Sequence, residues 1–422
     1  MSVAPDAFEY SLELMWALAG LSLVLFIVMF RYHVLLALIS QAAIRYRILK
    51  RPKILNNHPR IVILVPAHNE DVGIAATIGS IHALDYPKNA YRVMVIADNC
   101  TDQTATTARA CGAEVLERFN DEQKSKGYAL EYAIEHLQKE AVRPDAIVVI
   151  DADTRVDRQL LNVFAHRFQE GQDFIQAYYS VSNPDDSWRT QLMTYAFALF
   201  NGIWLAGQDQ LGLGCSLRGN GMCFSWRGLR RQPWRAYGLA EDLEFSWYLR
   251  TAGETIHFAS DARVYGEIIS GNAKASKNQR LRWEKGRAEL KTTFAREILL
   301  VKVPKLRKWI LKSDLNMIPL SRYVFGCLLG LLAALFSLIF AVSTGVGSAV
   351  ALSILLLMAY MVPMGYLGLY LSLPFTRLGL PLRYLFALTR APLYAAWKLK
   401  ILFSRTPVQW VRTERMADQK RD

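Results

Sequence analysis

Apolar and polar positions divide the 422-residue chain into three regions. Residues 12–30 form an apolar stretch whose only charge is Glu13, and a second apolar block covers residues 323–375. Between them, short runs of β-branched residues alternate with amphipathic stretches. The pattern predicts a water-exposed domain that is flanked in the sequence by membrane segments.

The apolar blocks have the lengths of transmembrane helices, because about 20 apolar residues cross a hydrocarbon core of roughly 30 Å. No basic segment precedes residues 12–30 and no small-residue cleavage site follows them, so we expect an uncleaved anchor and not a signal peptide. The second block is interrupted by STGVGS at residues 343–348, which predicts a turn between two spans. We therefore expect the chain to cross the membrane three times.

The middle region predicts an α/β domain. Its β-branched runs are each followed by an amphipathic stretch, a pattern typical of a largely parallel sheet. In such a sheet the ligand site lies outside the carboxyl ends of the strands. The runs are RIVILVPA, RVMVIAD, AEVLE and AIVVI.

Acidic residues stand at three of these predicted strand ends: Glu70, Asp98, and the pair Asp151 and Asp153. Two carboxylates one residue apart after a buried strand can hold a hard cation and leave positions for phosphate oxygens. A D-x-D pair alone is also typical of an ordinary loop. It is the convergence of several acids on one sheet edge that favours a ligand site.

The composition narrows the class of protein. With 52% hydrophobic residues the chain is too apolar for a purely soluble protein. Its net charge of +13 is typical of nucleic-acid binding, but much of the excess lies beside the apolar blocks, where anionic lipid headgroups account for it. No nucleic-acid-binding signature accompanies the charge, so we expect membrane lipids and no nucleic acid as partners.

Basic segments also predict the orientation in the membrane. RYRILKRPK follows the first apolar block, and KVPKLRKWILK precedes the second. By the positive-inside rule the N-terminus lies outside, and the middle region and the C-terminus are cytoplasmic. We expect a bacterial inner-membrane protein. The five cysteines form no C-x-x-C pair, which favours reduced thiols over a disulfide framework or a zinc site.

Seven short motifs, taken together, resemble the motif series of the family 2 glycosyltransferases. The closer resemblance is to the membrane-embedded branch that includes cellulose, chitin, hyaluronan and poly-N-acetylglucosamine synthases. It covers residues 60–283 and implies a GT-A (nucleotide-diphospho-sugar transferase) fold between membrane spans. In chain order the motifs are PAHNE, ADNCTD, SKGYAL, DADT, RGNGM, AEDLEF and QRLRW.

The resemblance implies roles in binding a nucleotide sugar, which we expect to be UDP-linked. Asp98 is the strand-end acid that would bond the uracil ring. Lys126 would lie near the diphosphate, although an exposed lysine without a role fits the same position. Asp151 would lie near the diphosphate too, and Asp153 would hold Mg2+ or Mn2+. The nucleoside neighbours would be Pro66, His68 and Glu70.

Asp242 falls where the family keeps its general base. Inverting transfer needs a carboxylate opposite the leaving group to take the proton of the acceptor hydroxyl. Without the other motifs, Glu241, Asp242 and Glu244 would be ordinary acids at a helix N-terminus. Asn220, between two glycines, is expected in the acceptor or donor-sugar pocket, although a plain hairpin turn fits as well. Its RGNGM motif departs from the corresponding cellulose synthase loop, which leaves the transferred sugar open.

QRLRW completes the resemblance. In the family, the Gln and Trp of this motif line the acceptor end of the pocket and the Arg contacts the donor diphosphate. Gln279 and Trp283 would thus bind the acceptor and Arg282 the diphosphate. Spacings of three and four residues can place these side chains on one helix face. Taken alone, the pentapeptide fits a membrane-facing surface helix equally well.

These features predict an active, inverting, membrane-bound glycosyltransferase that extends a polysaccharide. The alternative is a single addition to a membrane lipid or lipid-linked acceptor, and a non-catalytic glycan-assembly partner is less favoured. Three spans are few for a channel, so an exopolysaccharide would need a homo-oligomer or an export partner. The expected divisions are an anchor (1–50), a catalytic domain (51–290), interfacial helices (291–320), two spans (321–375) and a basic tail (376–422).

Overall fold

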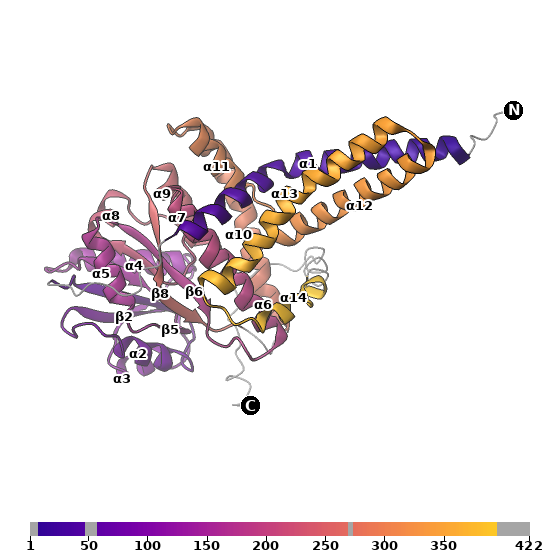
Figure 1. Ribbon diagram of the computed structural model, residues 1–422. Coiled ribbons are helices and arrows are strands. Elements are labelled where there is room, and N and C mark those ends of the chain that lie inside the picture. Colours follow the sequence, from indigo (N-terminus) through magenta and orange to yellow (C-terminus); the bar gives the residue numbers. More distant parts are fainter. Residues whose placement is uncertain (1–6, 47–56, 269–272, 395–422) are drawn as a thin grey trace.

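The computed structural model describes residues 7–46, 57–268 and 273–394, apart from the side chains of residues 7, 273–280, 282 and 283. Figure 1 shows an α/β domain from which a bundle of three long helices extends. The predicted tail from residue 395 onward lies outside the described residues, as does the basic segment 47–56.

A mixed, mostly parallel sheet forms the centre of the domain, as the sequence predicts. In the described part of the chain it has eight strands in the order β3-β2-β1-β4-β7-β6-β8-β5. Strands β3, β2, β1 and β4 are parallel, β7 is antiparallel to both neighbours, β6 and β8 are parallel, and β5 is antiparallel to β8. The strands are β1 (Ile61–Ala67), β2 (Tyr91–Asp98), β3 (Glu114–Arg118), β4 (Ala146–Val149), β5 (Thr154–Val156), β6 (Phe174–Val181), β7 (Met222–Ser225) and β8 (Ile256–Gly266).

Helices cover both faces of the sheet. Successive residues of β1 point into opposite layers, Ile63 into one and Leu64 into the other, and both are fully buried. Burial on both faces explains why the strands are continuous apolar runs and not alternating ones. The domain helices are α2 (Ile74–His82), α3 (Thr104–Ala110), α4 (Lys126–Lys139), α5 (Leu160–Gln169), α6 (Trp188–Phe197), the π-helix η1 (Ala198–Ile203), α7 (Trp204–Gln210), α8 (Trp226–Arg231), α9 (Glu241–Thr251), α10 (Ala273–Leu300), α11 (Lys305–Leu315) and α14 (Tyr384–Leu388).

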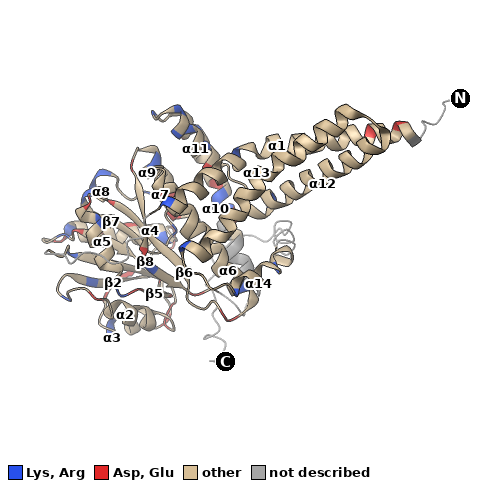
Figure 2. Ribbon diagram, viewed as in Figure 1, with Lys and Arg blue, Asp and Glu red and all other residues tan. Residues whose placement is uncertain are grey.

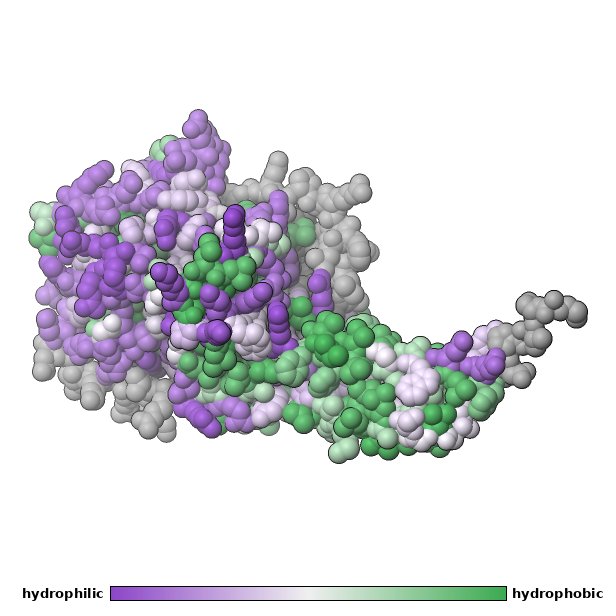
Figure 3. Space-filling model, turned by 90° about the horizontal axis from the view of Figure 1, so that it is seen from above, coloured by the Kyte–Doolittle hydropathy of each residue, from purple (hydrophilic) through white to green (hydrophobic). Residues whose placement is uncertain are grey.

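Three helices of the described chain are long and apolar enough to cross a membrane: α1 (Ala7–Arg45), α12 (Leu320–Thr344) and α13 (Gly347–Arg377). The turn between α12 and α13 lies where the sequence predicts it, at a left-handed Gly345. In Figure 2 the bundle carries few charges, and the bundle surface seen in Figure 3 is predominantly hydrophobic while that of the domain is predominantly hydrophilic.

Helix α1 continues well beyond the predicted span. Its 39 residues extend about 58 Å, whereas a hydrocarbon core measures roughly 30 Å. Exposed apolar side chains such as Val28 and Phe30 belong to its first part, and Ile39 farther along is fully buried against the domain. A Cβ on Gly207 of α7 would lie 2.6 Å from the Ile39 carbonyl oxygen, so α7 and α1 are in backbone contact.

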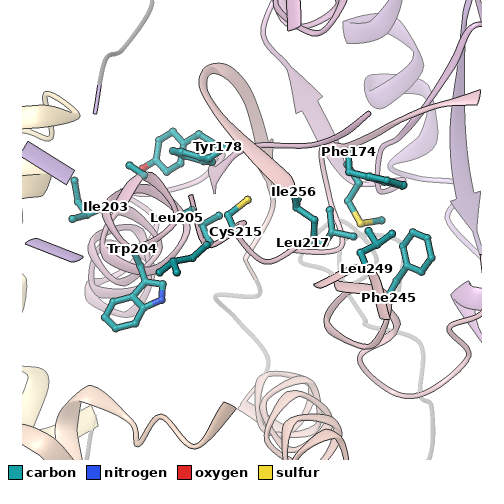
Figure 4. Packing of buried hydrophobic residues seen from close by; sticks show 14 of the residues in the cluster. Phe174, Tyr178, Ile203, Trp204, Leu205, Cys215, Leu217, Phe245, Leu249 and Ile256 are labelled. Carbon is teal, nitrogen blue, oxygen red and sulfur yellow. The ribbon is translucent and has the colours of Figure 1, made fainter. Parts of the chain in front are cut away.

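The bundle and the domain share one hydrophobic core. Figure 4 shows part of this core, which extends from Trp204 of α7 to Phe245 of α9. Polar contacts join the same two parts: the Tyr370 hydroxyl of α13 donates to the Leu199 carbonyl at 2.9 Å, and the hydroxyl of Tyr46, directly after α1, donates to the Phe258 carbonyl of β8. The α/β domain is therefore packed directly on the helix bundle, and α10 runs without a break across residue 290, the predicted domain boundary.

Candidate active site

The loops after β1 and β2 are held by two asparagines in the left-handed conformation, Asn69 (φ 55°) and Asn99 (φ 51°). Asparagine tolerates this conformation better than most residues. The Asn69 side chain accepts a hydrogen bond from the Thr101 amide at 2.7 Å, and the Asn99 side chain accepts one from the Asn120 amide at 2.8 Å. Each strand-end loop is thus tied to the next, which fixes the positions of the residues before the asparagines.

The predicted nucleoside residues gather at this edge. Pro66 lies near the end of β1, and the His68 ring contacts the Asp98 carbonyl through Nδ1 at 2.7 Å. Glu70 donates its backbone amide to the Thr104 hydroxyl at 2.7 Å. Parallel strands β1 and β2 therefore bring together residues that are about 30 positions apart in the chain, as their shared strand-end position predicts.

Asp98 has a partner that the sequence reasoning missed. Arg118, at the end of β3, donates to the Asp98 carboxylate at 2.7 Å, and both side chains are largely buried. Burial raises the pKa of Asp98, although Arg118 opposes the rise. The register between β2 and β3 pairs these two residues directly. The only signal in the sequence was a basic residue at the end of a predicted strand.

Lys126 connects the separate acidic motifs. Its Nζ lies 2.5 Å from Asp151 Oδ1, 2.5 Å from the Gly219 carbonyl and 3.7 Å from Glu241 Oε1. Burial alone would lower the pKa of Lys126, but the carboxylates of Asp151 and Glu241 outweigh it and the pKa is raised. Lys126 is therefore a charged, half-buried group with two carboxylate partners and not an ordinary exposed lysine, and its role at the diphosphate stays a prediction.

Close packing of a glycine holds Lys126 in place. A Cβ on Gly127 would lie 2.0 Å from the Ala236 carbonyl oxygen, so the first turn of α4 rests on backbone. Gly127→Ala is expected to destabilise the folded protein by about 1–3 kcal/mol, because backbone must move to admit the methyl group. Urea denaturation of the full-length protein in detergent measures this change.

Gly79→Ala is the matched control for that substitution. Gly79 lies inside α2, and a Cβ there would meet nothing within 4 Å. Alanine is the better helix former, so the free energy of unfolding of this variant is expected to rise by about 0.5–1 kcal/mol. Equal effects of the two substitutions would show that the packing of Gly127 does not determine the position of α4.

The loop of residues 219–221 contacts both Asp151 and Asp242. Gly219 and Gly221 have φ of 76° and 69°, and a Cβ on Gly219 would lie 3.3 Å from Asp242 Oδ2. Asn220 is fully buried; its side chain accepts from the Asp151 amide at 3.2 Å and donates to the Thr154 hydroxyl at 2.7 Å. The Asn220 side chain thus holds the Asp151–Asp153 turn, and its contact with an acceptor stays a prediction.

The Asp151–Asp153 turn supplies the donor set for a cation. The Asp153 carboxylate accepts from the Thr154 hydroxyl at 3.4 Å, and Asp151 lies against Lys126. Within the described residues no group of three His, Cys, Asp or Glu side chains could hold a metal by itself. Mg2+ that is bound together with a nucleotide typically needs only one or two carboxylates besides the phosphates. Two carboxylates on one turn fit such an ion.

The three acids at the start of α9 have different surroundings. The Glu244 carboxylate accepts from the Gly238 amide at 2.9 Å and the Tyr237 amide at 3.1 Å, while Glu241 faces Lys126. Asp242 faces Gly219. Burial raises the pKa of Asp242, against the opposing effect of Lys126 and Arg218. These acids are thus not equivalent helix-terminal residues, and Asp242 is the one beside the glycine loop.

Arg218 is the second residue that the sequence reasoning missed. Its amide donates to the Gln176 side chain at 2.8 Å and its guanidinium to the Phe200 carbonyl of η1 at 3.2 Å. The predicted residues Gln279, Arg282 and Trp283 lie in helix α10, but their side chains are outside the described part of the chain. Helix α10 itself passes close to the site, because a Cβ on Gly286 would lie 2.8 Å from that of Ala240.

The fold and the arrangement of acids around one lysine define the class: an α/β, GT-A-type glycosyltransferase. A family model described as "Glycosyltransferase like family 2" matches residues 58–286, more than half of the chain. The chain belongs to this family, and three of its described helices are long and apolar enough to cross a membrane.

Several known proteins resemble the chain. A beta-monoglucosyldiacylglycerol synthase of Nostoc sp. is 28% identical over 280 residues, which cover 63% of this chain and 56% of that protein. A probable glucomannan 4-beta-mannosyltransferase of Arabidopsis thaliana is 23% identical over 264 residues, covering 58% and 48%. The chain thus spans about half the length of these relatives. Neither is a cellulose, chitin or hyaluronan synthase, so the family is shown and the predicted narrower branch is not.

A solved structure agrees with the fold. The mannosyltransferase PcManGT from Pyrobaculum calidifontis, in complex with GDP-Man and Mn2+, has a TM-score of 0.52 and 18% identity. The match covers 92% of this chain and 100% of that one. At this identity the likeness concerns the fold, including the GT-A arrangement of the domain, and says nothing of the sugar or the acceptor.

Proposed function

We propose that the protein transfers a single sugar from a nucleotide diphosphate to a lipid acceptor at the membrane surface. The observation that carries the proposal is the position of Lys126, whose ammonium group lies between Asp151 and the Gly219 loop beside Asp242. One lysine thereby joins the acid predicted for the diphosphate to the acid predicted for the base. A site that holds the predicted diphosphate residues next to the predicted base has the parts that a transfer reaction needs.

The donor would bind along the carboxyl ends of β1, β2 and β4. Asp98, held by Arg118, would accept from the uracil ring, with Pro66, His68 and Glu70 beside the nucleoside. Lys126, Asp151 and Arg282 would surround the diphosphate, and Asp153 would hold Mg2+ or Mn2+. Such an ion, when bound, neutralises charge that develops on the departing diphosphate. The nucleotide would be UDP.

The acceptor would approach from the side of α9. Asp242 would take the proton of the acceptor hydroxyl as the oxygen attacks the anomeric carbon, so that the configuration at that carbon inverts. Burial raises the pKa of Asp242, which makes it a better proton acceptor once ionised, and Lys126 and Arg218 help to keep it ionised. Gln279, Trp283 and the loop around Asn220 would line the acceptor side.

The close packing of the helix bundle favours a lipid acceptor over a growing polysaccharide. Ser337 of α12 lies 2.9 Å from Ser353 of α13 through their hydroxyl oxygens, and it donates to the Met15 carbonyl of α1 at 3.0 Å. Contacts this short leave no room for a sugar chain between the three helices. A polysaccharide would therefore need a pore from other subunits or an export partner, whereas a lipid acceptor needs none.

Membrane orientation is part of the proposal. The most exposed apolar side chains of α1 lie up to Phe30, and farther along the helix Ile39 packs on α7 of the domain. With the basic segments on the domain side, the positive-inside rule places the site in the cytoplasm, at the level of the inner leaflet headgroups. The similarity to a beta-monoglucosyldiacylglycerol synthase also supports an acceptor drawn from the bilayer.

Product analysis tests the proposal. The full-length protein, reconstituted in vesicles that contain diacylglycerol and phospholipids, is given Mg2+ or Mn2+ and one nucleotide sugar at a time: UDP-glucose, UDP-galactose, UDP-N-acetylglucosamine or GDP-mannose. Mass spectrometry is expected to find a lipid that carries one sugar with one of the UDP donors. A water-soluble ladder of sugar polymers, with no glycolipid, would overturn the lipid acceptor and restore polysaccharide synthesis.

A further inference from the structure

The acceptor side of Asp242 carries cations that the donor site does not use. Arg218 stands next to Gly219, and its guanidinium is anchored by one bond to the Phe200 carbonyl. Its Nε is buried and has no hydrogen-bond partner among the described residues. A buried donor without a partner costs about 1–3 kcal/mol, more when it is charged. An incoming anion would remove this cost.

A second arginine lies close by on α10. Gly286 packs against Ala240, two residues before Asp242, and Phe294 of the same helix packs on Trp247 of α9 with ring centroids 6.1 Å apart. These contacts place Arg287 beside the start of α9. Arg287 is exposed and forms no ion pair within 4.0 Å among the described residues. Burial lowers the pKa of Arg218, and the charge of Arg287 lowers it further.

The carboxylates of Asp242 and Asp314 attract Arg218, but neither forms an ion pair with it within 4.0 Å among the described residues. Asp314, which also attracts Arg218, is already bound to Arg250 at 2.7 Å and to Gln208 at 3.0 Å. The row of cations continues away from the site with Lys291, whose pKa is lowered by burial and then by Arg287 and Arg322. Arg322 lies in the first turn of α12, a spanning helix. Lys291 lies one helix turn after Arg287 on α10, and it is the charge of Arg322, at the start of the long apolar helix α12, that acts on it.

We propose that Arg218 and Arg287 bind a phosphate group of the acceptor lipid, with Lys291 and Arg322 along its path from the bilayer. The acceptor would then be an anionic lipid whose headgroup has a hydroxyl a few bonds from a phosphate. Guanidinium groups suit phosphate oxygens, because they donate two parallel hydrogen bonds. The hydroxyl would lie at Asp242 while the phosphate lies between the arginines. This inference rests on the proposed lipid acceptor.

The donor diphosphate is the other source of such an anion, and the position of the base argues against it. A base for inverting transfer faces the sugar from the side opposite the leaving group. Lys126 and Asp151 pair with each other beside the Gly219 carbonyl, whereas the Arg218 guanidinium is bonded to the Phe200 carbonyl of η1. Arg287 lies on α10, the helix that packs on Ala240. These different supports lead us to assign the two arginines to the attacking group.

Acceptor competition tests this inference. The full-length protein is assayed with its active UDP-sugar in vesicles that contain either diacylglycerol or phosphatidylglycerol as the acceptor, in the same neutral carrier lipid. The wild type is expected to have a kcat/KM at least about 10-fold higher for phosphatidylglycerol, since one charge-assisted contact is worth about 1.5–3 kcal/mol. Arg287→Ala is expected to lose most of that preference. Arg296→Ala, an exposed arginine on the same helix, should keep it.

The outcomes separate this inference from the proposed function. Equal kcat/KM for the two lipids, with glycolipid formed from both, would overturn the phosphate site and leave the lipid acceptor in place. A raised KM for the UDP-sugar in Arg287→Ala, with lipid preference unchanged, would assign the arginines to the donor and also overturn the inference. Absence of any glycolipid would reject the proposed function itself.

Discussion

Replacing Asp242 by asparagine is expected to lower kcat for sugar transfer by about 10³-fold, within the range of 10²–10⁴ that a positioned general base contributes. Asparagine keeps the size of the side chain and its place beside Gly219, but it cannot take the proton of the acceptor hydroxyl. The donor diphosphate is proposed to bind at Lys126 and Asp151, so KM for the nucleotide sugar should change by less than about 10-fold, as expected when transition-state interactions alone are lost. Steady-state kinetics with purified protein measure both quantities.

Glu244→Gln is the matched control for Asp242. Glu244 belongs to the same helix turn and has the same charge, but its carboxylate accepts from the backbone amides of Gly238 and Tyr237. Glutamine can still accept these bonds, so activity should fall far less than in Asp242→Asn. If Asp242→Asn retained activity within a few fold of the wild type, Asp242 would be a helix-terminal acid and the base would have to be sought elsewhere.

Replacing Lys126 by methionine is the second large effect that we expect. Lys126 contacts Asp151 and the Gly219 carbonyl, and it lowers the pKa of Asp242. Its loss leaves acids without their cation and removes a positive charge near the diphosphate, so kcat/KM should fall by about 10²–10³-fold, a usual range for losing one preorganised donor.

Lys126→Met is also expected to move the pH dependence of kcat/KM in one particular direction. Asp242 acts as a base only when ionised. Without Lys126 its pKa rises further, so a larger part of Asp242 is protonated at a given pH. The acidic limb of the kcat/KM profile is therefore expected to move to higher pH in the variant. A shift to lower pH, or none, would contradict the coupling between Lys126 and Asp242.

Lys124→Met separates this effect from a general loss of charge. Lys124 is two residues away and pairs only with exposed Asp121 among the described residues, at 2.6 Å. Such exposed pairs contribute little to stability, because water and salt screen them. The profile of Lys124→Met should match the wild type, and an equal shift in both variants would assign the change to the overall field of the domain.

Much of the fold was predictable because its signals are local. The strands of the parallel half are buried on both faces, so they stand out as continuous runs such as AIVVI. The turn between the two later spans lies at Gly345, a glycine with φ 72°. By contrast, the antiparallel strand β7 and the π-helix η1 were missed, since tertiary contacts with β4, β6 and α13 determine them.

The candidate site shows the same division. Asp98 and Asp151 were singled out because they stand at the ends of predicted strands, whereas Asp242 was singled out by the family resemblance, and the roles of all three stay predictions. Arg118 and Arg218 were missed, since their roles depend on pairing across strands and on the carbonyl of Phe200. No local pattern encodes such contacts. QRLRW stays a prediction from resemblance, because the side chains of its Gln279, Arg282 and Trp283 lie outside the described residues.

The hydrophobic pattern of the sequence also did not predict the full length of α1. Residues after Phe30 are apolar enough to continue a helix, but only packing against α7 decides that they belong to the domain and not to the bilayer. That packing makes the bundle and the catalytic layer one body. The short contacts of Ser337 with Ser353 and Met15 inside the bundle argue against a channel there, which is why we propose a lipid acceptor in place of the polysaccharide predicted first.

The configuration of the product tests the central claim most directly. Asp242 is proposed to assist attack from the face opposite the diphosphate, so an α-linked nucleotide sugar must give a β-linked product. The proton NMR coupling of the anomeric hydrogen in the isolated product reports this configuration. We expect a β-linked sugar on the acceptor. An α-linked product would contradict inverting transfer and with it the role of Asp242 as the base.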